Sequence, residues 1–210
     1  MRKVTHYYIY IMKELKLIGV VAVCGMMAAC GNKGQQAPSS GGEDTVAVVV
    51  DQNKTVFGIC GDGSAMNTMQ LITDSGDTLT LSVAEARENS KVFGGYGSGD
   101  KMAVLLNADK TAAELVINET TLLGNWVMPN PIDGSSIVGI ALKDGGIAES
   151  IDQSTIVYKT WKIVDGRIEI LSMREGGGDE EETNVYDIVK LDADSLIYKN
   201  EEDLFEYGRQ

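Results

Sequence analysis

Histidine and cysteine are nearly absent from this sequence, and their scarcity excludes several kinds of functional site. The 210 residues include one histidine, His6, and three cysteines, Cys24, Cys30 and Cys60. Without a histidine beyond position 6, the rest of the chain cannot build a Ser-His-Asp or Cys-His catalytic arrangement, or a metal site that uses imidazole. A pair of Asp or Glu side chains across a cleft, as in glycosidases, is the catalytic alternative that remains, but no spacing in this acidic chain distinguishes such a pair. We expect no catalytic residue, no metal site and no cofactor, and predict that the protein is not an enzyme.

Long apolar runs are also missing, apart from one near the N-terminus. Leu17 to Ala29 is apolar or small throughout, and it follows the basic residues Arg2, Lys3, Lys13 and Lys16. Thirteen residues are too few for a membrane-spanning helix, which needs roughly 20. A basic start followed by a short apolar run is typical of a secretory signal peptide. We assign residues 1–29 to this signal; an ordinary signal peptide cleaved elsewhere and an N-terminal anchor helix are the alternatives.

The apolar run ends in Met27-Ala28-Ala29-Cys30-Gly31. These residues resemble the lipobox of bacterial lipoproteins, in which small residues precede a cysteine that receives acyl chains such as palmitate. The resemblance implies that Cys30 is lipidated, becomes the first residue of the mature chain and holds it to a membrane. Two or more acyl chains anchor a protein stably, whereas one does so only marginally.

Basic residues become still scarcer once the signal is removed. Losing four basic and one acidic residue leaves 14 basic and 30 acidic residues, a net charge of −16. Such a chain repels the phosphate backbone, so we expect no nucleic-acid partner. Residues 30–44 hold Cys30 and a tether rich in Gly, Ser and Gln, a composition that cannot build a core. No acidic cluster follows Cys30 directly, and we predict an outer-membrane anchor facing the periplasm.

From Thr45 onward, short apolar runs alternate with Gly, Asp and Asn, which predicts an all-β protein. The first unit, residues 45–118, has six candidate strands, and Ser82–Glu88 is the one candidate helix. A unit of this size predicts a small barrel of the OB or SH3-like kind. The candidate strands are Thr45–Val50, Thr55–Cys60, Met66–Thr73, Thr78–Val83, Lys101–Leu106 and Ala112–Ile117.

The second unit, residues 119–210, contains eight consecutive candidate strands with short links. Asp165-Gly166 is a strong hairpin signal between two of them. Eight strands in an up-and-down order can close into a barrel that is filled by its side chains or holds one small ligand. The candidates are Leu122–Met128, Ser136–Leu142, Gly146–Ile151, Thr155–Val164, Arg167–Met173, Asn184–Leu191, Ser195–Lys199 and Asp203–Gly208.

Leu123-Gly124-Asn125-Trp126-Val127, at the start of this meander, resembles the G-x-W signature of lipocalins. Together with Tyr158-Lys159-Thr160-Trp161 and the closing Tyr207-Gly208-Arg209, it is similar to lipocalin-like lipoproteins of Gram-negative gut bacteria. The resemblance implies an eight-stranded up-and-down barrel. It also implies that Trp126, beside Gly124, seals the base with Arg209 stacked on its ring, a cation–π contact of about 0.5–2 kcal/mol.

The barrel interior is the candidate binding site for a small apolar or amphipathic ligand. Trp161 and Tyr158 are the candidate ligand contacts, although alternation places them on opposite faces of their strand. Trp161 could equally be an ordinary core residue. An alternative is a structural lipoprotein with filled barrels that binds another envelope protein. Cys60 is expected to be a small buried residue, and the acidic loop Glu175–Glu182 a solvated loop rather than a calcium site.

Overall fold

The computed structural model describes residues 53–132, 134–152, 155–174, 176 and 180–210. All of them belong to one compact unit, Val49–Gln210. The predicted signal peptide, Cys30, the tether and the first candidate strand, Thr45–Val50, lie outside the described residues, as does part of the acidic loop.

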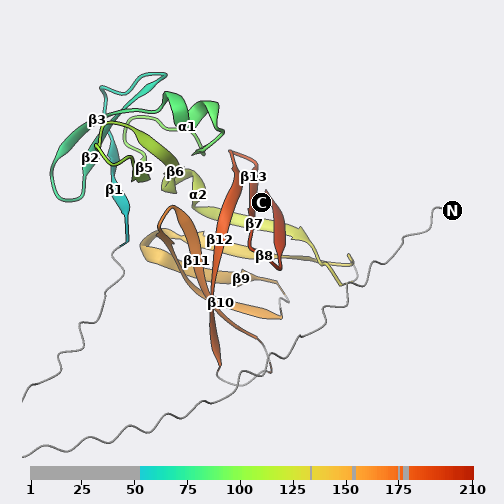
Figure 1. Cartoon of the computed structure of the whole chain (residues 1–210). Helices are drawn as coiled ribbons and strands as arrows, with labels where there is room; N and C mark the ends of the chain where they lie inside the picture. Colours follow the sequence, from blue (N-terminus) through green and yellow to red (C-terminus); the bar gives the residue numbers. More distant parts are fainter. Residues whose placement is uncertain (1–52, 133, 153–154, 175, 177–179) are drawn as a thin grey trace, which may run out of the picture. The chain divides into compact units, whose positions relative to one another are not determined.

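The protein is all-β, with a six-stranded sheet followed by a closed barrel (Figure 1). The sheet has the order β3-β2-β1-β5-β6-β4, and β4 pairs with β6 in parallel. Its strands are β1 (Thr55–Cys60), β2 (Thr68–Thr73), β3 (Thr78–Ser82), β4 (Val92–Phe93), β5 (Lys101–Leu106) and β6 (Ala113–Asn118). The helix α1 (Ala84–Glu88) follows β3, where the sequence predicted a helix.

The sequence predicted a small barrel of the OB or SH3-like kind for this unit, and the structure has a six-stranded sheet that no full ladder closes. An isolated parallel bridge joins Ser82, at the end of β3, to Ala112, just before β6. This single bridge brings the two ends of the β3-β2-β1-β5-β6 order together without a full ladder. The result is a partly open five-stranded arrangement, as in OB-folds, with β4 added at the edge. Within it, Cys60 is buried beside Met69 and Leu71.

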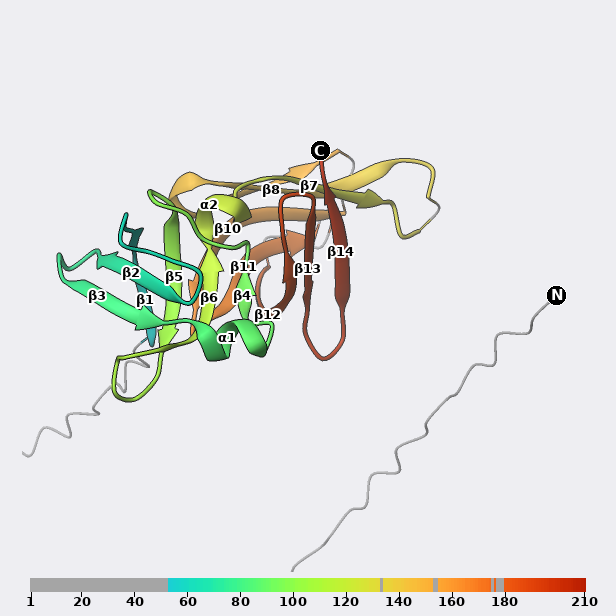
Figure 2. The same ribbon diagram turned by 90° about the horizontal axis from the view of Figure 1, so that it is seen from above.

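The eight remaining strands form the closed antiparallel barrel that the sequence predicted (Figures 1 and 2). Strand β14 closes it by pairing with β7, with Arg209 opposite Trp126. A short helix, α2 (Glu119–Leu122), precedes β7, and a 3-10 turn, η1 (Asp144–Gly146), joins β8 to β9. The strands are β7 (Gly124–Pro129), β8 (Ile137–Lys143), β9 (Ile147–Ile151), β10 (Ile156–Val164), β11 (Arg167–Arg174), β12 (Glu181–Leu191), β13 (Ser195–Lys199) and β14 (Leu204–Arg209).

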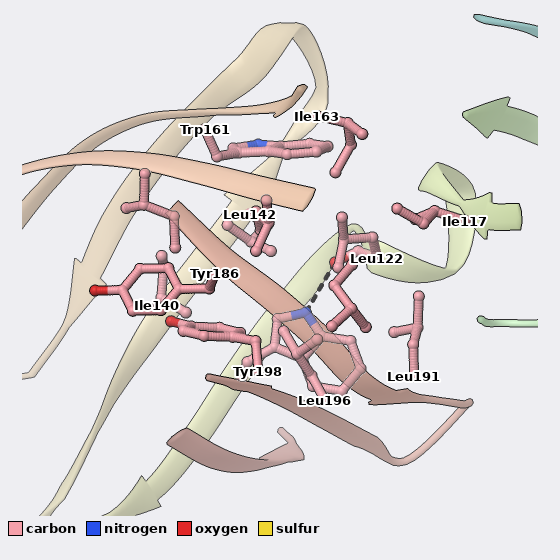
Figure 3. Close-up of a cluster of buried hydrophobic side chains, with 14 of the residues drawn as sticks. Ile117, Leu122, Ile140, Leu142, Trp161, Ile163, Tyr186, Leu191, Leu196 and Tyr198 are labelled. Atoms are coloured by element: carbon pink, nitrogen blue, oxygen red, sulfur yellow. Dashed lines mark hydrogen bonds between the residues drawn. The ribbon is translucent and has the colours of Figure 1, made fainter. Parts of the chain in front are cut away.

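The up-and-down order gives the barrel two distinct ends. The base holds Trp126, Arg209 and the turns 143–147, 164–167 and 191–195. The mouth, at the opposite end, is where β7 ends and β8 begins, and likewise for the pairs β9–β10, β11–β12 and β13–β14. A single hydrophobic cluster runs through the barrel and includes Phe93, Ala103 and Ile117 of the sheet. Figure 3 shows Ile117 and Leu122 at one end of this cluster and the hydroxyls of Tyr186 and Tyr198 directed toward the other.

Candidate functional site

Trp126 fills the base of the barrel and has no exposed surface. Its Nε1–H donates a hydrogen bond of 2.8 Å to the carbonyl oxygen of Leu122, the last residue of α2 (Figure 3). Asn118 caps this helix by accepting a hydrogen bond from the backbone N–H of Thr121. The indole N–H therefore has its partner inside the barrel, as a buried donor requires.

Arg209, at the end of β14, covers the Trp126 ring. The central guanidinium carbon lies 4.1 Å from the ring centroid. The guanidinium also donates to the carbonyl oxygens of Thr121 (2.6 Å) and Leu123 (2.9 Å). Gly124 has φ of +142°, and a side chain there would run into the Arg209 guanidinium. Only glycine at this position leaves room for the arginine over the indole.

Five aromatic rings occupy the half of the barrel that leads to the mouth. Tyr186 and Tyr198 have ring centroids 4.9 Å apart, and Phe205 lies 5.3 Å from Tyr198 and 5.7 Å from Tyr186. The Phe205 and Tyr207 rings are stacked at 6.0 Å. Tyr158 packs against the same cluster. We call these five residues the mouth cluster: Tyr158, Tyr186, Tyr198, Phe205 and Tyr207.

Burial divides the mouth cluster into two layers. Tyr186, Tyr198 and Tyr207 are buried, whereas Tyr158 and Phe205 are half-buried. Burial raises the pKa of all four tyrosines, and it raises that of Tyr186 to about 12. The Tyr198 and Tyr207 hydroxyls lie 3.4 Å apart. The cluster thus offers apolar ring faces and neutral hydroxyl groups.

Trp161 and Tyr158 both point into the barrel, contrary to the alternation that the sequence predicted. The pairing of β10 with β11 shifts by one residue between Tyr158 and Thr160. This β-bulge places two residues opposite one and resets the alternation of side chains. Tyr158 therefore joins the mouth cluster, while Trp161, 6% exposed, lies toward the base and donates through Nε1 to the carbonyl oxygen of Lys143 (2.9 Å).

Comparison with known proteins identifies the barrel. Residues 118–210 match the family model described as "Lipocalin-like". A lipocalin-like protein from Bacteroides thetaiotaomicron, solved as a crystal structure, is 32% identical, and the match covers 42% of this chain and 96% of that chain, with a TM-score of 0.38. The chain belongs to the lipocalin-like family. A search of curated proteins gave no match.

Each of the three turns at the base of the lipocalin-like barrel forms a hydrogen bond or an ion pair with the preceding part of the chain, residues 53–118. The Asn53 side chain donates to the carbonyl oxygen of Ile163 (2.9 Å) and accepts from the N–H of Asp165 (2.9 Å). The N–H of Gly166 donates to the Thr55 hydroxyl (3.0 Å). In the turn after β12, the carbonyl oxygen of Leu191 accepts a hydrogen bond from the N–H of Gly94, which follows β4 (2.9 Å). In the turn between β8 and β9, Asp144 forms an ion pair with Lys101 of β5 (2.8 Å).

No group of three or more His, Cys, Asp or Glu side chains within the described ranges is arranged to hold a metal ion. Glu180, Glu181 and Glu182 of the acidic loop are all exposed. In the same part of the chain, no helix is both long enough and apolar enough to span a membrane.

Four members of the mouth cluster were not predicted from the sequence: Tyr186, Tyr198, Phe205 and Tyr207. The hairpin register brings three of them together, because Tyr198 pairs with Phe205 across β13–β14 and Tyr207 pairs with Leu196. The alternation of apolar residues over Ser195–Lys199 could have indicated that Leu196 and Tyr198 face inward together.

Proposed function

We propose that this protein is a lipid-anchored, non-enzymatic binding protein that takes a small apolar or amphipathic ligand at the mouth of its lipocalin-like barrel. The observation that supports this proposal is the mouth cluster. Tyr158 and Phe205 are half-buried there and pack with three buried tyrosines. A buried aromatic floor with two partly exposed rings is suited to receive an apolar body.

The shape of the interior favours a shallow site. Trp126, Leu142 and Trp161 fill the base half of the barrel and are at most 6% exposed. A ligand would therefore contact the mouth cluster from the side of the connecting loops. Its apolar part would lie on the Phe205 and Tyr158 rings, and a polar group could reach the tyrosine hydroxyls.

The ligand-binding proposal is tested with the neutral apolar probe N-phenyl-1-naphthylamine, whose fluorescence rises in apolar surroundings. We expect saturable binding by the soluble chain, residues 31–210, and binding weakened about fivefold or more by Phe205→Ala, because the ring is lost. Leu204→Ala is the matched control, since the neighbouring Leu204 side chain is 58% exposed. Equal weakening by both substitutions, or no saturable binding, would contradict the proposal.

The native ligand itself can be sought by purifying the protein from its own membrane and analysing a denaturing extract by mass spectrometry. We expect an apolar or amphipathic small molecule that is enriched over an extract of the Phe205→Ala variant. Equal recovery from both proteins would count against the mouth as its site.

The anchor forms the second half of the proposal. Cys30 follows a short apolar run and small residues, as lipidated cysteines do. Growth with an alkyne-tagged palmitate should label the wild-type protein and leave Cys30→Ser unlabelled, with Cys60→Ser as the control. Fractionation of the cell envelope would then test the predicted outer-membrane, periplasm-facing location.

A second candidate function is an interaction lipoprotein whose barrel takes no ligand. The continuous buried cluster that runs from Trp126 to Tyr198 favours it, because side chains occupy the positions a deep ligand would need. A protein captured by crosslinking in the intact envelope, together with failure of both ligand experiments, would support this function over the first.

A further inference from the structure

We propose a second binding site, for an organic cation with an apolar body, in a cavity between strand β1, helix α2 and the β8–β9 turn at the base of the barrel. This site goes beyond the proposed function, because it lies at the opposite end of the barrel from the mouth cluster. It is built jointly by residues of the sheet and of the barrel.

The cavity has a volume of about 420 Å³. That lies within the roughly 300–1,000 Å³ range of small-molecule sites. Its apolar lining consists of Phe57 and Ile59 of β1, Leu123, and Trp161 and Ile163 of β10. Ile59 is 45% exposed, so part of this lining faces solvent. Gly58, Gly145 and Gly146 add stretches of wall without side chains. An aliphatic or aromatic body would therefore find apolar contacts on more than one side.

Five charged residues line the same cavity, and three of their charges are already compensated. Lys101 and Asp144 form an ion pair of 2.8 Å with each other. Lys162 forms an ion pair of 2.8 Å with Glu169, which is not part of the lining. The two carboxylates that remain, Glu119 and Asp74, form no ion pair within the described part of the chain. The lining therefore carries uncompensated negative charge.

Glu119 is the residue that would gain most from a cation. It is half-buried at the start of α2. Burial is the largest cause that raises its pKa, and Asp74 and Asp144 raise it further, while Lys101 acts in the opposite direction. The positive charge of Lys101 therefore does not fully offset the burial of the Glu119 carboxylate and the two nearby negative charges. A ligand ammonium group beside Glu119 would supply the missing positive charge, while the ligand body covers Leu123 and Trp161.

The test uses 4-phenylbutylamine as the probe, compared with the neutral 4-phenylbutanol and the anionic 5-phenylpentanoate. Calorimetry on residues 31–210, which keep the whole compact unit, gives the three affinities. Nuclear magnetic resonance gives the place of binding, because the chain has only two tryptophans. The Trp161 indole N–H should shift on binding, since Trp161 is a lining residue of the cavity, and the signal of Trp126, which is not one, should shift less.

We expect the amine to bind more tightly than the alcohol and the carboxylate. Glu119→Gln and Asp74→Asn should each weaken amine binding about three- to fivefold, as expected for partly exposed charge pairs. Glu114→Gln, an exposed carboxylate outside the cavity, should leave it unchanged. Asp74 is itself exposed, so its substitution keeps the test valid if Glu119→Gln folds poorly.

Equal affinities for the amine and the alcohol, tighter binding of the carboxylate, or an unshifted Trp161 signal would each overturn the proposal. The Phe205→Ala variant separates the two sites. It should bind the amine normally even though it loses the naphthylamine probe. Loss of amine binding in that variant would move the amine to the mouth and leave the base cavity without a ligand.

Discussion

At the residue scale, the exposed side chain of Arg209 covers the base of the barrel. Its guanidinium stacks on the Trp126 ring and donates to backbone carbonyl oxygens of Thr121 and Leu123. A guanidinium supplies a flat surface and several fixed donors at once, whereas an ammonium group does not. Charge alone therefore cannot replace arginine here.

Arg209→Lys should lower the free energy of unfolding by about 1–2 kcal/mol, because the stack and at least one backbone partner are lost. Urea unfolding followed by tryptophan fluorescence measures the change. Arg174→Lys, at the mouth end of β11, is the control and should change stability little. Equal stability of Arg209→Lys and the wild type would show that the stack contributes nothing.

The tyrosines of the barrel give a second prediction at this scale. Burial raises the pKa of Tyr158, Tyr186, Tyr198 and Tyr207 in the folded protein. An unfolded tyrosine has a pKa of about 10. The folded state therefore holds these protons more tightly, and its stability falls as the pH rises above about 10. Below that pH the contribution is constant.

Near-ultraviolet absorbance of tyrosinate should show the native barrel tyrosines still protonated at a pH where urea-unfolded protein is ionised. For Tyr186 the native midpoint should lie at about 12 unless the barrel unfolds first. Coincident native and unfolded titration curves would contradict the buried position of the mouth cluster.

At the element scale, the first residue of β7 decides whether the barrel can close over its tryptophan. Gly124 has a backbone conformation that L-residues with side chains rarely adopt, and its open side is filled by Arg209. Both constraints act together, so the glycine and the arginine form one structural unit although they are far apart in sequence.

Gly124→Ala should therefore destabilise the protein by about 2–4 kcal/mol, from backbone strain together with a displaced arginine. Gly76→Ala is the matched control. Gly76 also has a positive φ, +92°, but nothing lies within 4 Å of an added methyl group. Thermal unfolding of both variants measures the difference. A larger loss for Gly76→Ala would mean that the Arg209 contact is unimportant.

Most strands could be predicted from the sequence because Gly, Asp and Asn residues separate the apolar runs and mark the strand ends. The segments Thr55–Cys60, Lys101–Leu106 and Ser195–Lys199 were predicted with the bounds that the structure shows. Strand β4 was not predicted, because two residues in a parallel pairing leave no alternating pattern. The bulge in β10 was also missed, since an extra residue is indistinguishable from a normal one until its partner strand is known.

At the scale of the whole molecule, the sheet and the barrel share buried residues and hydrogen bonds. Sequence reasoning divides them into separate units, 45–118 and 119–210, because composition says nothing about contacts between distant segments. In the structure, Phe93 and Ile117 belong to the same hydrophobic cluster as Trp126. Asn53 and Thr55 bond the turn around Gly166.

We therefore expect the sheet and the barrel to unfold in one transition. Both tryptophans lie in the barrel, so their fluorescence reports on it. Cys60, buried in the sheet, is the only cysteine of residues 31–210, so its reaction with a thiol reagent reports on the sheet. The two urea midpoints should coincide, and Asn53→Ala should lower both together. Midpoints that separate would show two independent folding units.

The contacts between the base turns and the sheet also determine where this fold tolerates inserted residues. Each of the turns 143–147, 164–167 and 191–195 makes a contact with the sheet. Extra residues in any of them would push Lys101, Thr55 or Gly94 away from its partner. The four connections at the mouth join neighbouring strands, and their described residues carry none of these contacts. An engineer who grafts a recognition loop onto this scaffold should therefore choose the mouth, where lengthening a connection leaves the junction with the sheet intact.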